Sequence, residues 1–328
     1  MTVAHETERD DQALALMRRA HELIPRGEWE GASAALEQAA ALHEAAGRVY
    51  DRARCLQLAA TLRRSAGDAE NARLLADRAA AVAPEDPQLA VSIATEQAEA
   101  AFAESRYRDA VSAWSRAIEQ AREAGLKADG LSALLRRRAA ALVSAGEVEP
   151  ASRDYDEAFR LLEASQGRET AGFVRTEQAD LLFQYGHADR AAQVLDALDA
   201  GSGPHLLAET LVMRARLARA AGRIDDAIEC ASRAREAALK AVAPVSYFAA
   251  GVELAEAYEA RLDRINAYGA LATAWATLND LLGEGVARSW VEPVLICYQI
   301  QWGEQAFLDA KRDYEARRRA VMDARRNE

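Results

Sequence analysis

The sequence predicts an all-α protein in which about seven antiparallel helix pairs stack as a solenoid, followed by C-terminal capping helices. The main observation is a set of three columns of positions that recur at a period near forty residues. The first column comprises Ala20, Ala60, Ala98, Ala139, Ala179, Ala215 and Ala255. The second, twelve residues later, comprises Ala32, Ala72, Ala110, Ala151, Ala191, Ala227 and Ala267. The third, seven residues further on, comprises Ala39, Ala79, Ala117, Ala158, Leu198, Ala234 and Ala274.

These columns are too regular to arise from composition alone. Twenty of the 21 positions are Ala, whereas 21 positions drawn at random from a chain with 78 Ala among 328 residues would hold about five. A residue with only a methyl group lets two helix backbones approach to the short end of the usual spacing of about 8–10 Å. Each repeat is therefore predicted to be two helices that are joined by a short turn and pack antiparallel through their small residues.

Glycine marks most of the turns within the pairs. In the third repeat we expect helices from Gln88 to Glu104 and from Tyr107 to Glu123. Five of the seven turns carry Gly, which readily takes the left-handed conformation that ends a helix. These residues are Gly27, Gly67, Gly146, Gly186 and Gly222. Ser105 and Leu262 occupy the other two turns, so we expect a different turn geometry there.

Proline agrees with these boundaries, because it is tolerated in the first turn of a helix and not in its interior. Four prolines fall where helices are expected to begin. They are Pro87, Pro150, Pro204 and Pro244. Pro84 follows a second helix and is expected to end it.

The combination of small residues, turn glycines, aromatic residues and a closing proline resembles the tetratricopeptide repeat family over residues 13–283. The residues that carry the likeness, besides the columns, are Tyr107 and Trp114 in the third repeat, Gly67 and Pro84 in the second, Trp29 in the first and Tyr155 in the fourth. The resemblance implies a right-handed α-α superhelix. Successive repeats begin 36 to 41 residues apart, compared with about 34 in the common form of the family, so the chain is similar to its longer-repeat branches.

In that family the first helix of each pair lines a concave groove that binds a partner. Carried over, the resemblance places these residues in the groove: Glu96, Glu99, Phe102, Arg136, Arg137, Phe173, Glu177, Asp180, Phe183, Arg216, Arg219, Glu253 and Glu256. The sign of their charge alternates from one repeat to the next. One interpretation is that neighbouring repeats neutralise each other through salt bridges. The other is that the groove binds a peptide of mixed charge, with the phenylalanines as apolar contacts.

The two ends of the chain differ from the repeats. Residues 1–12 are polar and acidic, and we expect a disordered tail. Residues 284–328 are expected to form capping helices, the first interrupted near Pro293 and the last running from about Glu304 to Arg326. Ten of the 20 aromatic residues lie in 240–328. They suit the core of a solenoid cap, and the alternative is an aromatic docking surface for a partner or for a second copy in a homodimer.

The last predicted helix is locally basic. Its arginines could bind an acidic partner, and they include Arg317, Arg318, Arg319, Arg325 and Arg326. We favour the simpler interpretation, a solvated helix whose C-terminal cations suit the helix dipole.

Composition excludes several classes of partner. The chain has a formal net charge of −11 and a pI of about 5.2, so it repels phosphate backbones and no nucleic-acid partner is expected. The three cysteines are far apart and form no CxxC, which favours reduced thiols over disulfides. The sequence shows no signal peptide and no apolar stretch able to span a bilayer. We therefore expect a cytoplasmic protein without a membrane partner.

No motif supports catalysis. Asp225, Asp226 and Glu229 form a DDxxE sequence that is similar to the magnesium motif of helical terpene synthases. Such carboxylates must converge in a deep apolar cavity, and we interpret them here as acidic residues that stabilise a helix N-terminus. No HExxH, phosphate-binding loop or nucleophile motif is present. The sequence thus predicts no enzyme, no cofactor and no metal.

These observations favour an adaptor or scaffold that binds a protein or peptide in the groove. Two alternatives stay open. One is a sensor in which a peptide or small ligand changes the curvature of the solenoid and regulates a partner. The other is an all-helical enzyme, which would need a substrate or metal cavity.

Overall fold

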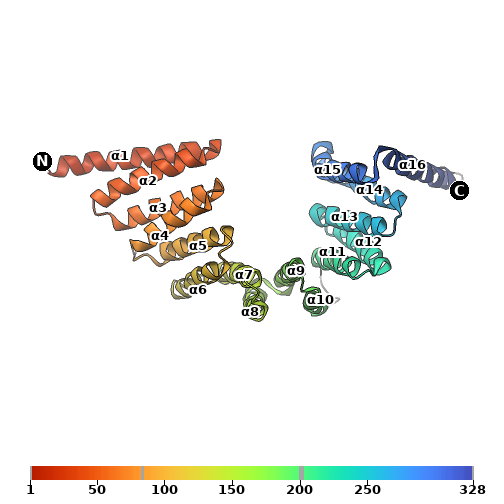
Figure 1. The fold of residues 1–328 in the computed structure, drawn as a ribbon, viewed down its shortest axis with the longest axis horizontal. Helices are drawn as coiled ribbons and strands as arrows, with labels where there is room; N and C mark the ends of the chain where they lie inside the picture. Colours follow the sequence, from red (N-terminus) through yellow and green to blue (C-terminus); the bar gives the residue numbers. More distant parts are fainter. Residues whose placement is uncertain (1, 83–84, 199–202, 327–328) are drawn as a thin grey trace. The chain divides into compact units, whose positions relative to one another are not determined.

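The structure, a computed structural model, describes residues 2–82, 85–198 and 203–326, and the side chains of 9–82, 85–198 and 203–324. These residues form sixteen α-helices and one short 3-10 helix, with no strand among them (Figure 1). Within each of the two units described next, consecutive helices pack against each other as antiparallel neighbours. The all-α, paired-helix prediction is therefore confirmed. The chain divides into two compact units, an N-terminal unit (Met1–Gln166) and a C-terminal unit (Gly167–Glu328).

The N-terminal unit contains four helix pairs. Its helices are α1 (Thr2–Leu23), α2 (Trp29–Ala45), α3 (Val49–Ser65), α4 (Ala69–Ala81), α5 (Pro87–Ala103), α6 (Tyr107–Glu123), α7 (Ala128–Ser144) and α8 (Val148–Gln166), with the 3-10 helix at Ile24–Arg26. The two helices expected in the third repeat are α5, which is displaced by one residue, and α6, which coincides with the prediction.

The C-terminal unit contains three further pairs and the two terminal helices. Its helices are α9 (Arg168–Gln184), α10 (Ala188–Asp196), α11 (Pro204–Ala220), α12 (Ile224–Lys240), α13 (Pro244–Ala260), α14 (Arg264–Leu282), α15 (Glu284–Trp302) and α16 (Glu304–Arg326). Three of the four prolines expected at helix starts are the first residues of α5, α11 and α13, and Pro150 is the third residue of α8. Pro84 lies outside the described residues.

The Ala of the three columns lie in the contacts between neighbouring helices, which we call the seams. All twenty Ala of the three columns are buried, each with at most 2% of its surface exposed. The seams are close: a Cβ built on Gly251 of α13 would lie 3.1 Å from the Cβ of Ala274 on α14. Leu198, the exception in the columns, is only half-buried and follows the end of the nine-residue α10. Since α10 ends at Asp196, Leu198 lies outside the helix and not in a close contact between two helices, so a larger side chain fits there.

The expectation of two different turns is wrong. Ser105 (φ 59°) and Leu262 (φ 62°) adopt the same left-handed backbone as the five turn glycines, whose φ lies between 73° and 83°. The hydrogen bonds explain this. Asp263 N donates to Tyr258 O (2.9 Å), as Asp68 N does to Arg63 O (2.9 Å) in a glycine turn. The closing hydrogen bonds and the packing of the pair impose the left-handed residue, at a cost of roughly 1–2 kcal/mol when that residue is not Gly.

The predicted disordered tail is also wrong, because α1 begins at Thr2. The segment 2–12 contains no Gly or Pro and runs directly into the first repeat helix, so its Ala, Glu, Gln and Arg residues extend that helix. Asp10 forms a salt bridge with Arg48, just before α3.

The interruption expected near Pro293 is absent, and α15 runs through this residue. Pro293 and Ser289, whose carbonyl loses its usual donor, are both exposed, so water can replace the missing hydrogen bond. The last helix, α16, begins and ends where the sequence predicted. All ten C-terminal aromatic residues belong to one cluster that spans α11 to α16, as expected of a cap. No helix among the described residues is long and apolar enough to cross a membrane.

Candidate binding face of the first helices

The residues predicted to line the groove lie on the first helices of the pairs. We call this surface the first-helix face. It is formed by α3, α5 and α7 in the N-terminal unit and by α9, α11, α13 and α15 in the C-terminal unit. Polar contacts join each of these helices to the next within its unit, so the face is continuous in each unit.

In the N-terminal unit, two salt bridges cross from one first helix to the next. Arg64 of α3 donates to both carboxylate oxygens of Glu96 on α5, at 3.1 and 3.3 Å. Glu99, one turn further along α5, forms a salt bridge with Arg137 of α7. Glu96 is buried (6% exposed) beneath its contact with Arg64, so it points into the seam and not into an open groove.

In the C-terminal unit, five of the predicted residues form a continuous series of salt bridges. Arg216 of α11 contacts Asp180 of α9 (2.6 Å) and Glu253 of α13 (2.8 Å). Arg219, one turn along α11, contacts Glu253 (3.2 Å) and Glu256 (3.8 Å). We call Asp180, Arg216, Arg219, Glu253 and Glu256 the ion-pair ladder. It joins three successive first helices, with Glu253 buried at its centre.

The first of the terminal helices, α15, extends this face. The Tyr298 hydroxyl donates to Glu256 (3.0 Å), and the Gln301 amide donates to Glu259 (3.2 Å). Burial raises the pKa of Tyr298, and the charge of Glu256 raises it further, so the phenol stays protonated and acts as a donor. This segment has no repeat register in the sequence, yet α15 occupies the place of a further first helix.

The predicted apolar contacts are partly used within the fold. Phe102 packs edge-to-face on Tyr107, with ring centroids 5.4 Å apart, and Phe173 packs similarly on His205 at 4.9 Å. Phe183 is half-buried on α9, one turn after Asp180. Of the remaining predicted residues, Arg136 and Glu177 also interact with other parts of the chain.

The structure therefore supports the first interpretation of the alternating charges, mutual neutralisation between repeats. These salt bridges do not bury the first-helix face, which stays accessible to solvent. The side chains of Asp180 and Glu256 are 38% and 41% exposed, and those of Arg216 and Arg219 are 32% and 31% exposed. The ladder is a fixed and accessible array of both signs of charge.

Sequence reasoning missed the partner of Glu96. Arg64 lies 32 residues before Glu96, and Arg219 lies 34 residues before Glu253. In both pairs an Arg in the last turn of a first helix reaches the middle of the next first helix. This shared arrangement, with the Arg 32 or 34 residues before the Glu, is a signal that the sequence contains.

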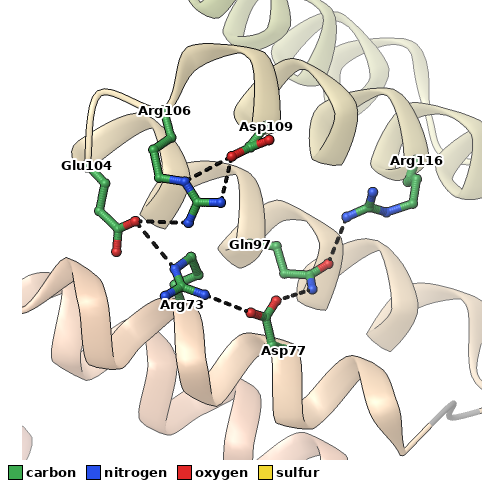
Figure 2. A network of polar contacts seen from close by, with 7 residues as sticks. All are labelled: Arg73, Asp77, Gln97, Glu104, Arg106, Asp109 and Arg116. Atoms are coloured by element: carbon green, nitrogen blue, oxygen red, sulfur yellow. Dashed lines mark hydrogen bonds and ion pairs between the residues drawn. The ribbon is translucent and has the colours of Figure 1, made fainter.

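A second polar network was also missed. It joins α4, α5 and α6 and is drawn in Figure 2. Gln97 donates to Asp77 (2.7 Å) and accepts from Arg116 (3.2 Å). Glu104 accepts from Arg106 (3.3 Å) and forms a salt bridge with Arg73 (3.3 Å). The network holds three arginines and, with Asp109, three carboxylates, so it is neutral and ties neighbouring pairs together.

The DDxxE carboxylates are surface residues at the start of α12. Each carboxylate forms a salt bridge with a different arginine: Asp225 with Arg261 (2.7 Å), Asp226 with Arg223 (3.1 Å) and Glu229 with Arg233 (3.5 Å). All three carboxylate side chains are more than half exposed, and each faces a different cation. Within the described part of the chain, no three His, Cys, Asp or Glu side chains are placed to hold a metal ion.

Comparison with known proteins identifies the fold. No family model and no curated protein matches the chain. Among solved structures, a signal-transduction ATPase with numerous domains from Pyrococcus horikoshii, described as having a tetratricopeptide repeat sensor, is similar with a TM-score of 0.56 at 16% identity. The match covers 88% of this chain and 45% of that protein, so this chain spans less than half of its length.

The apo form of RapI is similar over nearly its whole length. Its TM-score is 0.51 at 12% identity, and the match covers 96% of this chain and 97% of RapI. At these identities the likeness shows the fold alone. The chain thus has a tetratricopeptide-repeat-like fold of sequential helix pairs, as its Ala columns predicted.

Proposed function

We propose that the chain is a non-catalytic scaffold that binds a protein or an extended peptide on the first-helix face of its C-terminal unit. The observation that carries this proposal is the ion-pair ladder, because it presents both signs of charge in fixed positions across three successive repeats. A repeat fold supports the same kind of function, since stacked helix pairs create extended binding surfaces.

The ladder suits a peptide of mixed charge. Arg216 donates to its two carboxylates through Nε and Nη1, and the Nη2 hydrogens are available to a carbonyl or carboxylate of a ligand. Asp180 and Glu256, at the two ends of the ladder, can accept from basic side chains of the same ligand. Since the salt bridges already fix these side chains, binding loses less conformational entropy than it would on an unpaired surface.

Phe183 supplies an apolar contact beside the ladder. It follows Asp180 by three residues on α9, so the two side chains lie on the same helix face. Half-buried aromatic side chains next to polar groups are frequent anchors at interfaces. We therefore place the centre of the binding site between α9 and α11.

A second candidate function is that of a sensor, in which the bound peptide or small ligand regulates another protein. The similar ATPase from Pyrococcus horikoshii is described as having a repeat sensor, and this likeness favours the candidate at the level of fold only. A sensor for a small ligand would show a saturable thermal shift with a single compound, whereas a scaffold would not.

The test is capture of partners from source-cell lysate with three forms of the full chain. They are the wild type, Glu177→Arg/Asp180→Arg on the first-helix face, and Asp225→Arg/Glu229→Arg on α12 as a control with the same change in net charge. We expect a partner that binds the wild type and the control and is lost by the first variant. A partner retained equally by all three forms would refute the site, provided that circular dichroism shows each form to be folded.

A further inference from the structure

A cleft of about 420 Å³ lies at the C-terminal end of the described chain, between α14, α15 and α16. Its floor is aromatic. Tyr268 of α14 packs edge-to-face on Phe307 and on Tyr314 of α16, with ring centroids 5.6 and 5.7 Å apart. Gly269 makes this packing possible, because a Cβ there would lie 2.5 Å from the Tyr314 ring. The Tyr314 hydroxyl also hydrogen bonds with that of Thr273 (3.1 Å), so α16 is fixed across α14.

Apolar side chains extend from this cleft onto the surface of α15. Ile296 lines the cleft and is 48% exposed, and Ile300, one turn later, is 78% exposed. Of the 17 large apolar side chains that are exposed among the described residues, six lie on these two terminal helices. They are Val286, Ile296, Ile300, Leu308, Val321 and Met322. Exposed apolar side chains are thus concentrated on α15 and α16, and exposed apolar surface favours association with another molecule.

The charged residues of the cleft differ from those of the ladder. Glu292, Lys311, Glu315 and Arg318 line the cleft, and none of them forms a salt bridge with another residue that the structure describes. The set contains two carboxylates and two cations, so it is complementary to itself. A two-fold contact between two copies can therefore pair the carboxylates of one copy with the cations of the other.

The surroundings also favour a second copy as the occupant. The chain carries a net charge of −11, so most surfaces of two copies repel each other. The last helix is an exception, because α16 holds seven basic and five acidic residues. Repulsion between two copies is therefore weakest where the apolar side chains and the unpaired charges lie.

We infer that the C-terminal cleft is a self-association surface that binds a second copy of this chain. Ile300 of each copy enters the cleft of the other, where it contacts the aromatic floor, and the carboxylates of one rim pair with the cations of the other. The contact is isologous, so both copies bury the same surface. This surface is separate from the ion-pair ladder, and either proposal can fail without the other.

The first test is sedimentation equilibrium of the full chain at concentrations up to about 100 µM. We expect a monomer–dimer equilibrium that Ile300→Asp weakens at least about tenfold, since it places a charge in the aromatic cleft. The control is Val245→Asp, which changes an equally apolar and 65% exposed side chain on α13 and should leave the equilibrium unchanged. A monomeric wild type, or a dimer that Ile300→Asp does not weaken, would overturn the inference.

The second test distinguishes a second copy from a different partner. Lys311→Glu/Arg318→Glu makes the rim of the cleft acidic, and Glu292→Lys/Glu315→Lys makes it basic. Each variant alone should be monomeric, because its own rims repel, and an equimolar mixture should recover the dimer. A mixture that stays monomeric, with both variants folded by circular dichroism, would show that these charges do not meet across an interface.

Discussion

Replacing Ala274 with Leu should destabilise the C-terminal unit by about 2–3 kcal/mol, because the position lies in a seam with no spare room. Ala274 has 0% of its surface exposed, and it faces Gly251 across the α13–α14 contact. A single carbon added to Gly251 would lie 3.1 Å from the Cβ of Ala274. Carbon atoms prefer a separation of about 3.5–4.0 Å, so even that one carbon would require a shift of the neighbouring atoms by a few tenths of an ångström.

Leu adds three carbons to a side chain that faces Gly251 across the helix contact. A glycine has no side chain that could turn away to accommodate them. The cost therefore lies in the upper part of the range of about 1–3 kcal/mol that overpacking of a core produces. For a unit of this size, that corresponds to a fall in melting temperature of about 5–10 °C.

The assay is thermal and urea unfolding followed by circular dichroism, with Ala260→Leu as the matched control. Ala260 is an exposed residue of α13, so the same substitution there should change stability by less than about 0.5 kcal/mol. If Ala274→Leu unfolds together with the wild type and the control, the columns do not mark close-packed seams and the packing argument is refuted.

Three further predictions concern single residues. Glu253→Gln should destabilise the C-terminal unit by about 1–3 kcal/mol in urea unfolding, because two arginines lose the buried charge between them. Leu262→Gly should raise the free energy of unfolding by about 1 kcal/mol, and with it the melting temperature. Leu262 is 81% exposed, so its side chain contributes little packing, and its left-handed backbone (φ 62°) is strained in any residue but Gly. Burial raises the pKa of the Cys55 thiol to about 11, so near pH 8 it should react with a thiol reagent far more slowly than exposed Cys297.

The sequence predicted the helix pairs well because the packing requirement is local and repeated. A small residue at each seam is needed in every pair, so the Ala columns carry the signal many times over. The turns show where such reasoning fails. Leu262 adopts the geometry of a turn glycine because the hydrogen bonds of the helix end require it, and the cost of strain in one residue is small beside the packing of the whole pair.

The candidate site was predictable in its residue types and not in its pairing. The family resemblance placed Arg216 and Glu253 on the same face, and the structure brings them to 2.8 Å. They are 37 residues apart in the chain, so their contact depends on how one pair stacks on the next. The same is true of the C-terminal cleft, which exists because α16 crosses α14 over Gly269. No local pattern in the sequence encodes that crossing.

Photo-crosslinking from Phe183 tests the binding face most directly. A photoreactive phenylalanine analogue at this position lies beside the ion-pair ladder, and the same analogue at Leu239, a 50% exposed residue of α12, serves as the control. We expect the captured partner to crosslink to position 183 and not to position 239. Crosslinking from position 239 with none from position 183 would show that the partner does not bind on the first-helix face.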